Sequence, residues 1–427
     1  MTGEPVTTHR RILGAAAVLT LALSAAYGST PASAAPAAAC GEGATVKETL
    51  PNGTTWKLCW RIDAVAGLVL ENVGISSVHY PNAVQVLDSI RLGQLNVPYD
   101  DGETEYNDLT DYGFGGYSLM TLGADDCKNG SARTGTDGSE EGERRKVLCV
   151  SAEPSGPAYR LQYGENQAYT RTGADLVLRS ISQIGWYEYV TEYRLHDNGQ
   201  ITARLGATGD LSPYNFVGAD QGWPIGKGQK DFASNHYHSA FWRVDFNIGG
   251  AGNEQVEQYD TAKTGQGPAA AQLTTTRTPI TTEGKFTRAN QRWWRVVSPT
   301  SKNKDQHNRS YELGFGATDV YPGHPEMTPD VTFSESHACE KFATDNKDPE
   351  CPDQKTILKY IKDGETLTDP VMWVRVGFHH VPRDEDQSPM PTHWQGFELT
   401  PRDFTEVNRL APDELAGNNG QPDTGGR

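Results

Sequence analysis

Apolar residues occur along this chain in short runs, separated by turns that contain glycine and proline. The runs are rich in Val, Ile, Tyr and Trp, which are residue types that favour β-strands. Helical periodicity is scarce, and only 335–343 and 354–361 have apolar residues at helical spacing. The strongest strand candidates are 68–73, 84–92, 176–184, 190–195, 201–207, 240–246, 293–297, 372–378 and 395–399.

One turn also predicts how two strands pair. Asp197-Asn198-Gly199 lies between 187–195 and 200–207, and an Asn-Gly pair between apolar segments is typical of a β-hairpin. No internal repeat or sustained linker divides the chain, although 261–271 has the composition of a long exposed loop. The pattern therefore predicts a mostly β fold, one large antiparallel β-sandwich with few short helices.

The N-terminus has the three-part layout of a secretory signal peptide. His9-Arg10-Arg11 precedes an apolar run over 12–26, and the small residues Ala32-Ser33-Ala34 follow it. The adjacent arginines leave the twin-arginine export route open, and the apolar run is too short for a comfortable membrane span. The mature protein is therefore expected to be secreted. The chain is expected to divide into a signal peptide at 1–34, a folded domain at 35–410 and a disordered polar tail at 411–427.

The formal net charge of the 427 residues is −17. Nucleic acid is therefore not expected as a partner, because its binding requires a basic face. An acidic surface attracts cations such as amines, but it is also an ordinary way for a protein to stay soluble.

Export permits disulfide bonds, and the chain has six cysteines. The sequence leaves several pairings open. Pairing of sequence neighbours is favoured, because each bond would then close one loop between regular segments. The predicted bonds are Cys40–Cys59, Cys127–Cys149 and Cys339–Cys351.

Two histidines, His236 and His238, lie in a stretch that is predicted to be a strand. Side chains at i and i+2 leave a strand on the same face, so both imidazoles can bind one metal ion. A second histidine pair, His379-His380, lies at the end of another predicted strand. Three neutral imidazoles suit copper(II), zinc or nickel, and the sequence alone does not choose among these metals.

Two further groups of polar residues are candidate sites. Asp245 and Asn247 share a strand face and Asp369 precedes the strand that leads to His380; such oxygen ligands suit calcium, although acids of this kind are more often solvated. In 106–115, carboxylates lie among aromatic residues and glycines. A carboxylate enclosed by aromatic groups has a raised pKa and can act as a general base, although an exposed turn is the simpler interpretation.

Several blocks resemble, in order, the catalytic domain of copper amine oxidases, from about residue 55 to residue 404. The segments around Cys127 and Cys149 resemble those that hold the family's disulfide. The other blocks are VPY at 97–99, the pattern YxDxxxYGxG at 106–115, HDNGQITARLGATG at 196–209, the His-x-His and RVDFN segments, and DPVMWVRVGFHHVPRDED at 369–386.

The resemblance implies a homodimeric β-sandwich enzyme that binds copper and oxidises primary amines. Copper would be bound by His236, His238 and His380. We place His380 rather than His379 as the third ligand, since family members often have another residue type directly before that ligand. The family's redox cofactor, topaquinone, is made from a tyrosine of the chain, and Tyr187 aligns with that tyrosine.

The resemblance also implies roles for three residues around the quinone. Asp108 aligns with the general base, Tyr106 with the residue that lines the substrate entrance, and Tyr99 with the hydrogen-bond partner of the quinone. The amine would form a Schiff base with the quinone made from Tyr187, and Asp108 would remove a proton from the carbon beside nitrogen. The products would be an aldehyde, ammonia and hydrogen peroxide, with oxygen as the oxidant.

The cofactor motif departs from the family pattern Thr-x-x-Asn-Tyr-Asp/Glu. Gln183 replaces the threonine and Trp186 replaces the asparagine that orients the ring, whereas Tyr187 and Glu188 agree with the pattern. A second hypothesis is therefore an exported copper-binding protein of the same fold that has lost or altered quinone formation. Asn247 stands where an acid is common, which lowers the expected calcium affinity by removing a charge.

Overall fold

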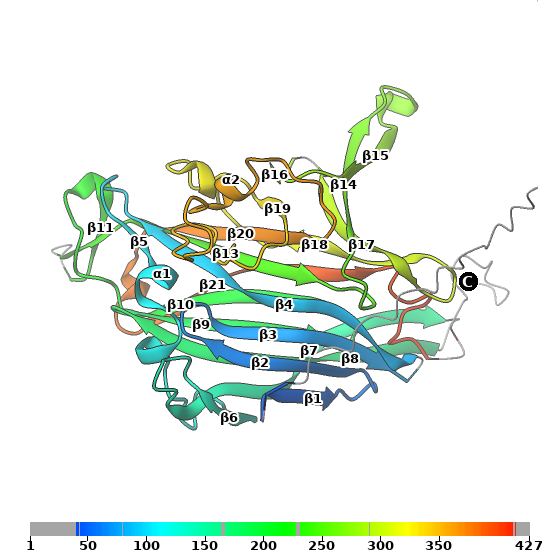
Figure 1. The fold of residues 1–427 in the computed structure, drawn as a ribbon, viewed down its shortest axis with the longest axis horizontal. Coiled ribbons are helices and arrows are strands. Elements are labelled where there is room, and N and C mark those ends of the chain that lie inside the picture. The colour runs from blue at the N-terminus through cyan, green and yellow to red at the C-terminus, as the bar shows by residue number, and fades with distance from the viewer. Residues whose placement is uncertain are drawn as a thin grey trace, which may run out of the picture. The chain divides into compact units, whose positions relative to one another are not determined.

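Two antiparallel β-sheets contain most of the strands in the computed structural model, and most of these strands run roughly along the horizontal axis of Figure 1. The first sheet has the order β1 (Thr45–Thr49), β2 (Thr55–Asp63), β3 (Gly67–Ser77), β4 (Tyr80–Pro98), β13 (His236–Phe246), β20 (Pro370–His380), β19 (Val331–Glu335) and β16 (Gly284–Phe286), with β5 (Glu105–Asn107) paired to β4. The second has the order β15 (Leu273–Ile280), β14 (Gln255–Lys263), β17 (Trp293–Lys302), β18 (Asn308–Phe315), β21 (Met390–Arg402), β10 (Ile201–Gly209), β9 (Tyr187–His196), β8 (Gln167–Ile184), β7 (Arg144–Tyr163) and β6 (Gly130–Thr136). A small additional sheet pairs β11 (Gly222–Ile225) with β12 (Asp231–Ser234).

The structure describes residues 40–412 except 42, 79, 164–166, 228–230 and 290, and it also describes residue 415. These residues belong to one compact unit, Pro36–Arg427. The predicted signal peptide at 1–34 and most of the predicted tail at 411–427 lie outside the described residues. Helix within the described part is limited to α1 (Asp108–Tyr112), α2 (Ile357–Tyr360) and the 3-10 turns η1 (Gly116–Ser118), η2 (Ala219–Gln221), η3 (Pro268–Ala270), η4 (Pro325–Met327) and η5 (Asp384–Asp386).

One hydrophobic core joins the two large sheets. Trp242 of β13 packs edge-on against Tyr193 of β9 and Phe397 of β21, with ring centroids 5.5 and 5.9 Å apart. The buried Tyr193 hydroxyl lies 3.2 Å from the backbone oxygens of Leu68 and Ile90, so a side chain of the second sheet also bonds to the backbone of the first. This arrangement is the predicted antiparallel β-sandwich, with side chains of both inner faces filling the space between the sheets.

The strand and disulfide predictions are confirmed. All nine candidate segments lie within observed strands. The predicted hairpin is formed by β9 and β10, which pair antiparallel with Leu195 opposite Ile201. The disulfides join Cys40 to Cys59, Cys127 to Cys149 and Cys339 to Cys351.

The helix predictions fare less well. The predicted helix at 335–343 is wrong, because Glu335 is the last residue of β19 and the backbone after it forms hydrogen bonds with distant segments. For example, the Ala343 amide donates to the Gly93 backbone oxygen of β4 at 2.9 Å. Only α2 forms within 354–361. The sequence pattern also missed α1, a single helical turn that places Asp108 in the site described below.

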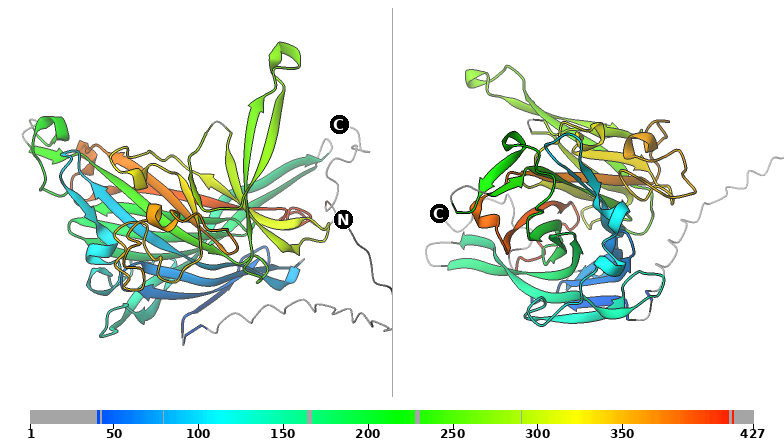
Figure 2. Two further views of the ribbon diagram at one scale, coloured as in Figure 1. Left: turned by 45° about the horizontal axis from the view of Figure 1, so that its top comes forward. Right: turned by 90° about the vertical axis from the view of Figure 1, so that its left-hand side faces the viewer.

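The predicted loop at 261–271 is shorter than expected. Its first residues continue β14, which pairs with β15 through contacts such as Thr261 opposite Thr275. The resulting hairpin forms the edge of the second sheet, and its outer part projects beyond the other strands (Figure 2). The exposed, threonine-rich β15 lacks the alternation of apolar and polar residues that predicts a strand.

Candidate active site

Three buried histidines converge at one end of β13 and β20. The two strands pair antiparallel with His236 opposite His380, and His238 is opposite Phe378. Because His236 and His238 are two residues apart, their rings leave β13 on the same face. One ring nitrogen of each of the three histidines lies within 4.8 Å of the others. The structure thus brings together the three histidines that were singled out, whereas the ring of His379 reaches Asp100 instead.

Bonds to the Ser234 backbone, the Asp386 carboxylate and the Tyr189 hydroxyl occupy one nitrogen of each ring and leave the other for Tyr187 or a metal ion. Nδ1 of His236 lies 2.9 Å from the Ser234 oxygen, so it carries the proton, and Nε2 is left as an acceptor. Nε2 of His380 bonds to Asp386 at 3.2 Å, which leaves Nδ1. Nε2 of His238 is buried and has no hydrogen-bond partner. A buried polar nitrogen without a partner is unfavourable, and a metal ion would supply the partner.

Burial also sets the protonation state of these histidines. It lowers the pKa of His236 to about 3 and that of His380 to about 4, although Asp386 opposes the shift at His380. Burial and the neighbouring rings lower the pKa of His238 as well. All three imidazoles are therefore neutral near pH 7, which is the form that binds a metal.

A carboxylate behind His380 orients its ring. Asp386, in the 3-10 turn η5, accepts hydrogen bonds from His380 at 3.2 Å and from His393 at 2.9 Å. Carboxylates in this position fix the tautomer of a ligating histidine and raise its basicity. The sequence interpretation missed Asp386 and His393 as site residues, because their spacing from His380 matches no recognisable motif and His393 lies on another strand, β21.

Tyr187 places its hydroxyl against the histidine cluster. The oxygen lies 2.9 Å from Nε2 of His236 and 3.1 Å from Nδ1 of His380, the two nitrogens that their other bonds leave free. Tyr187 is the first residue of β9, and it faces Ile184 across a two-residue turn. Gly185 takes a positive φ of 59° in this turn, which suits a tight hairpin. The side chain is buried, and burial raises its pKa well above the ordinary value.

Trp186 is the second residue of that turn. Its side chain is 40% exposed and packs edge-on against Tyr214, with ring centroids 4.9 Å apart. The backbone opposite the turn is close-packed, since a side chain at Gly209 would approach the Trp186 oxygen to 2.7 Å. The bulky indole is therefore accommodated at a partly exposed position, while the Tyr187 hydroxyl reaches His236 and His380.

A cavity of about 170 Å³ lies beside Tyr187. Asp108, which begins α1, lines it and is only 5% exposed. Burial raises the pKa of Asp108 to about 7, although a hydrogen bond from the Tyr189 hydroxyl opposes the shift. The remaining walls are mostly aromatic or aliphatic: Val97, Tyr99, Tyr106, Tyr112, Ile184, Trp186, Tyr189 and Tyr214.

Tyr99 and Tyr106 connect this cavity to the histidines. The Tyr99 ring stacks on His236 at 5.0 Å and meets the Tyr106 ring edge-on at 5.9 Å. Burial raises the pKa of Tyr99 to about 12, so its hydroxyl stays protonated as a hydrogen-bond donor. A buried carboxylate and the buried Tyr99 and Tyr187 therefore line one small cavity, and the Tyr187 hydroxyl connects it to His236 and His380, which lie outside its lining.

A sequence model described as copper amine oxidase, enzyme domain, matches residues 46–412. The chain belongs to the copper amine oxidase family. It is 26% identical over 391 residues to primary amine oxidase 2 of Arabidopsis thaliana, covering 83% of this chain and 57% of that protein. It is 27% identical over 393 residues to a primary amine oxidase of Klebsiella aerogenes, covering 82% and 51%. The chain therefore spans little more than half the length of these curated relatives.

The fold agrees with solved structures of this family. A copper-containing benzylamine oxidase from Hansenula polymorpha superposes with a TM-score of 0.72 at 19% identity, covering 90% of this chain and 64% of that one. At this identity the likeness concerns the fold alone. No helix among the described residues has both the length and the apolar character that crossing a membrane would need.

The residues predicted to bind calcium lie apart from the histidine cluster. The Asp245 carboxylate pairs with Arg243 at 2.8 Å, and the Asn247 amide donates to Asp88 at 2.8 Å. Burial raises the pKa of Asp369 to about 6, and repulsion from Asp245 adds to the shift. Among the described residues, neither of the two groups close enough to share a metal ion contains these side chains. The calcium site stays a prediction.

Proposed function

We propose that the protein oxidises primary amines with copper and topaquinone, using oxygen and releasing an aldehyde, ammonia and hydrogen peroxide. The observation that carries the proposal is the Tyr187 hydroxyl, which lies 2.9 Å from His236 and 3.1 Å from His380. A tyrosine that is oxidised by a metal and oxygen must have its ring at that metal. The donor set fits copper as well, since three neutral imidazoles with one unpartnered buried nitrogen suit this ion.

In this proposal His236, His238 and His380 hold the copper ion. Ser234 and Asp386 keep the two outer rings in the tautomers that turn a lone pair toward the ion. Copper would supply the oxygen chemistry that converts Tyr187, and the quinone would supply a carbonyl for the amine and an electron sink.

Asp108 is proposed as the base that accepts a proton from the carbon beside the amine nitrogen. It lies in the same small cavity as Tyr187, and its raised pKa suits proton transfer near neutral pH. The aromatic walls exclude water and contact the apolar part of the amine, with Tyr106 at the entrance. Tyr99 is proposed to donate a hydrogen bond to the quinone.

The proton-accepting role of Asp108 predicts a pH dependence. Its carboxyl group can accept a proton only when ionised, and burial raises its pKa to about 7. We therefore expect kcat/KM to rise about tenfold per pH unit up to about pH 7 and then to level off. The measurement should use two amines whose own pKa values differ. If the pH at which kcat/KM levels off is the same for both amines, it reports a group of the protein. Levelling off near the ordinary aspartate pKa of about 4 would contradict the assignment.

A second prediction concerns Trp186, where the family has asparagine. Because the Tyr187 hydroxyl already contacts two histidines, we expect Trp186→Asn to change the yield of quinone little. We expect it to change KM for the amine instead, since the indole lines the cavity and packs on Tyr214. Quinone is titrated with a carbonyl reagent, and KM is measured on the same preparation. A large gain of quinone in the variant would mean that the indole hinders maturation.

The function itself is tested on protein prepared without metal and then exposed to copper and oxygen. The peptide that contains Tyr187 should gain the mass of two oxygen atoms less two hydrogen atoms, and primary amines should then yield hydrogen peroxide. Copper bound beside an unmodified Tyr187 would favour the second candidate, an exported copper-binding protein with lost or altered quinone formation. The replacements at Gln183 and Trp186 are what keep this candidate open.

The proposal extends to export and assembly. Three disulfides suit an oxidising compartment, which supports secretion through the signal peptide at 1–34, with 35–410 as the catalytic domain. A homodimer is expected from the family. We also propose calcium near Asp245, Asn247 and Asp369. The negative charges of Asp88 and Glu335 help to raise the pKa of Asp369, so further acids are close enough to attract a cation there.

A further inference from the structure

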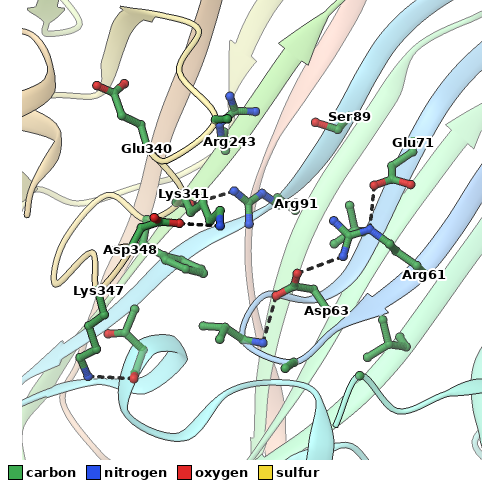
Figure 3. A pocket seen from close by; sticks show the side chains of 18 residues that line it. Arg61, Asp63, Glu71, Ser89, Arg91, Arg243, Glu340, Lys341, Lys347 and Asp348 are labelled. Carbon is green, nitrogen blue, oxygen red and sulfur yellow. Dashed lines mark hydrogen bonds and ion pairs between the residues drawn. The ribbon is translucent and has the colours of Figure 1, made fainter. Parts of the chain in front are cut away.

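A second cavity lies on the first sheet, away from the face that packs against the second sheet. Its volume is about 760 Å³, and it shares no lining residue with the cavity beside Tyr187. Residues of β2, β3, β4 and β13 form its floor, and the segment 338–348 covers one side (Figure 3). Charged side chains dominate the lining, among them Arg61, Asp63, Arg91, Arg243, Glu340 and Lys341.

Arg91 differs from the other cations of this cavity. It is only 8% exposed, and among the described residues no carboxylate lies within ion-pair distance of it. Its guanidinium donates to the Lys341 backbone oxygen at 3.1 Å and lies 5.4 Å from the centre of the Phe342 ring (Figure 3). The other cations each pair with an acid: Arg61 with Glu71, Arg243 with Asp245, Lys341 with Asp348, and Lys347 with Asp345.

The neighbour of Arg91 on the next strand is also an arginine. Arg243 of β13 lies directly opposite Arg91 of β4, and its buried Nε has no hydrogen-bond partner. Burial and repulsion from Arg243 lower the pKa of Arg91 to about 10, so it remains charged at neutral pH. Like charges opposite each other and a buried charge without a counter-ion both oppose folding. An anion bound between these side chains would offset both effects.

Two buried or hydrogen-bonded acids of this cavity, Asp63 and Glu340, are not available as that anion. The Asp63 carboxylate is held by Arg61 at 3.0 Å and by the backbone amides of Val65 and Ala66 at the same distance. Glu340 is 2% exposed, and neither of its carboxylate oxygens has a hydrogen-bond partner. Burial raises the pKa of Glu340 to about 7, so its negative charge is incomplete at neutral pH.

We propose that this cavity binds a small oxyanion, a carboxylate or a phosphate, through the guanidinium of Arg91, with Arg243 and Ser89 beside it. A planar guanidinium matches the two oxygens of such groups and bonds them more strongly than neutral acceptors. The volume lies within the range of about 300–1,000 Å³ that is usual for small-molecule sites. The net charge of −17 disfavours anions over the protein as a whole, so binding must come from this local group.

The test is calorimetric titration of the full, copper-loaded protein with inorganic phosphate and, separately, with succinate, at constant ionic strength. We expect saturable binding of at least one probe, and the two probes separate phosphate ligands from carboxylate ligands. Arg91→Met should weaken this binding by at least about tenfold. Arg402→Met is the matched control, because it removes the same charge from an exposed side chain that is paired with Glu312. No saturable binding to the wild type, or equal binding to Arg91→Met, would overturn the proposal.

Two further measurements separate a binding site from a structural contact. If Arg91 serves an anion, Arg91→Met should not lower the melting temperature in the absence of the probes, and the probes should raise the melting temperature of the wild type alone. If Arg91 only ties the segment 338–348 to β4, the melting temperature of Arg91→Met should be lower than that of the wild type. The probes should then change the melting temperature of neither protein. Glu340→Gln removes an acid from the cavity and should tighten binding. Unchanged or weaker binding by Glu340→Gln would contradict the assignment even if Arg91→Met did not fold.

Discussion

Replacing Tyr187 with phenylalanine is expected to abolish amine oxidation without loss of copper. The hydroxyl is the atom that lies against His236 and His380, so its removal takes away the starting group for the quinone but none of the three imidazoles. Turnover of primary amines should fall to the background rate. Copper content, carbonyl-reagent titration and hydrogen peroxide release should be measured on one preparation.

Tyr193→Phe provides the matched control for this experiment. Tyr193 lies on the same strand and is also buried, but its hydroxyl bonds to backbone oxygens in the core. Its loss should lower the free energy of unfolding by about 1–3 kcal/mol and leave the quinone in place. Activity in Tyr187→Phe would contradict the assignment of the cofactor tyrosine. Copper binding by the wild type without any quinone would support the copper-binding alternative.

Replacing Asp108 with asparagine is expected to lower kcat/KM by about 10²–10⁴-fold while the quinone still forms. The substitution keeps the size and the buried position of the side chain but removes the atom that accepts the proton. The loss should appear mainly in kcat, because the aromatic walls that bind the amine stay unchanged. Rapid mixing with substrate should show slow reduction of a normal amount of quinone.

Asp111→Asn is the control for Asp108→Asn. Both acids lie on α1, but Asp111 is exposed and pairs with Lys347 at 3.1 Å. We expect Asp111→Asn to retain nearly full kcat/KM. Equal losses of kcat/KM in the two variants would mean that the charge or the stability of α1 controls the rate, rather than proton transfer at Asp108.

Local patterns account well for the strands of this protein. Alternation of apolar and polar residues and the Asp-Asn-Gly turn depend on neighbours in sequence, so the strand candidates and the hairpin of β9 and β10 could be predicted. The two-residue period of a strand also placed His236 and His238 on one face before any partner was known. Where backbone hydrogen bonds run between distant segments, the same reasoning failed. The segment 335–343, which was predicted to be a helix, is instead held in an irregular conformation by hydrogen bonding to β4 and by the Cys339–Cys351 disulfide.

The sequence by itself determined the strand content and the pair of histidines, favoured the pairs of cysteines that the structure shows and, through resemblance, indicated the family. Tertiary structure decided which side chains meet. The register of β13 against β20 sets His380 opposite His236, and the turn at Gly185 aims the Tyr187 hydroxyl at both. The burial of Asp108 and the position of Arg91 opposite Arg243 likewise arise from contacts between segments far apart in the chain. The periodicity of a sequence describes one segment at a time, so it cannot predict the distances between side chains of different segments.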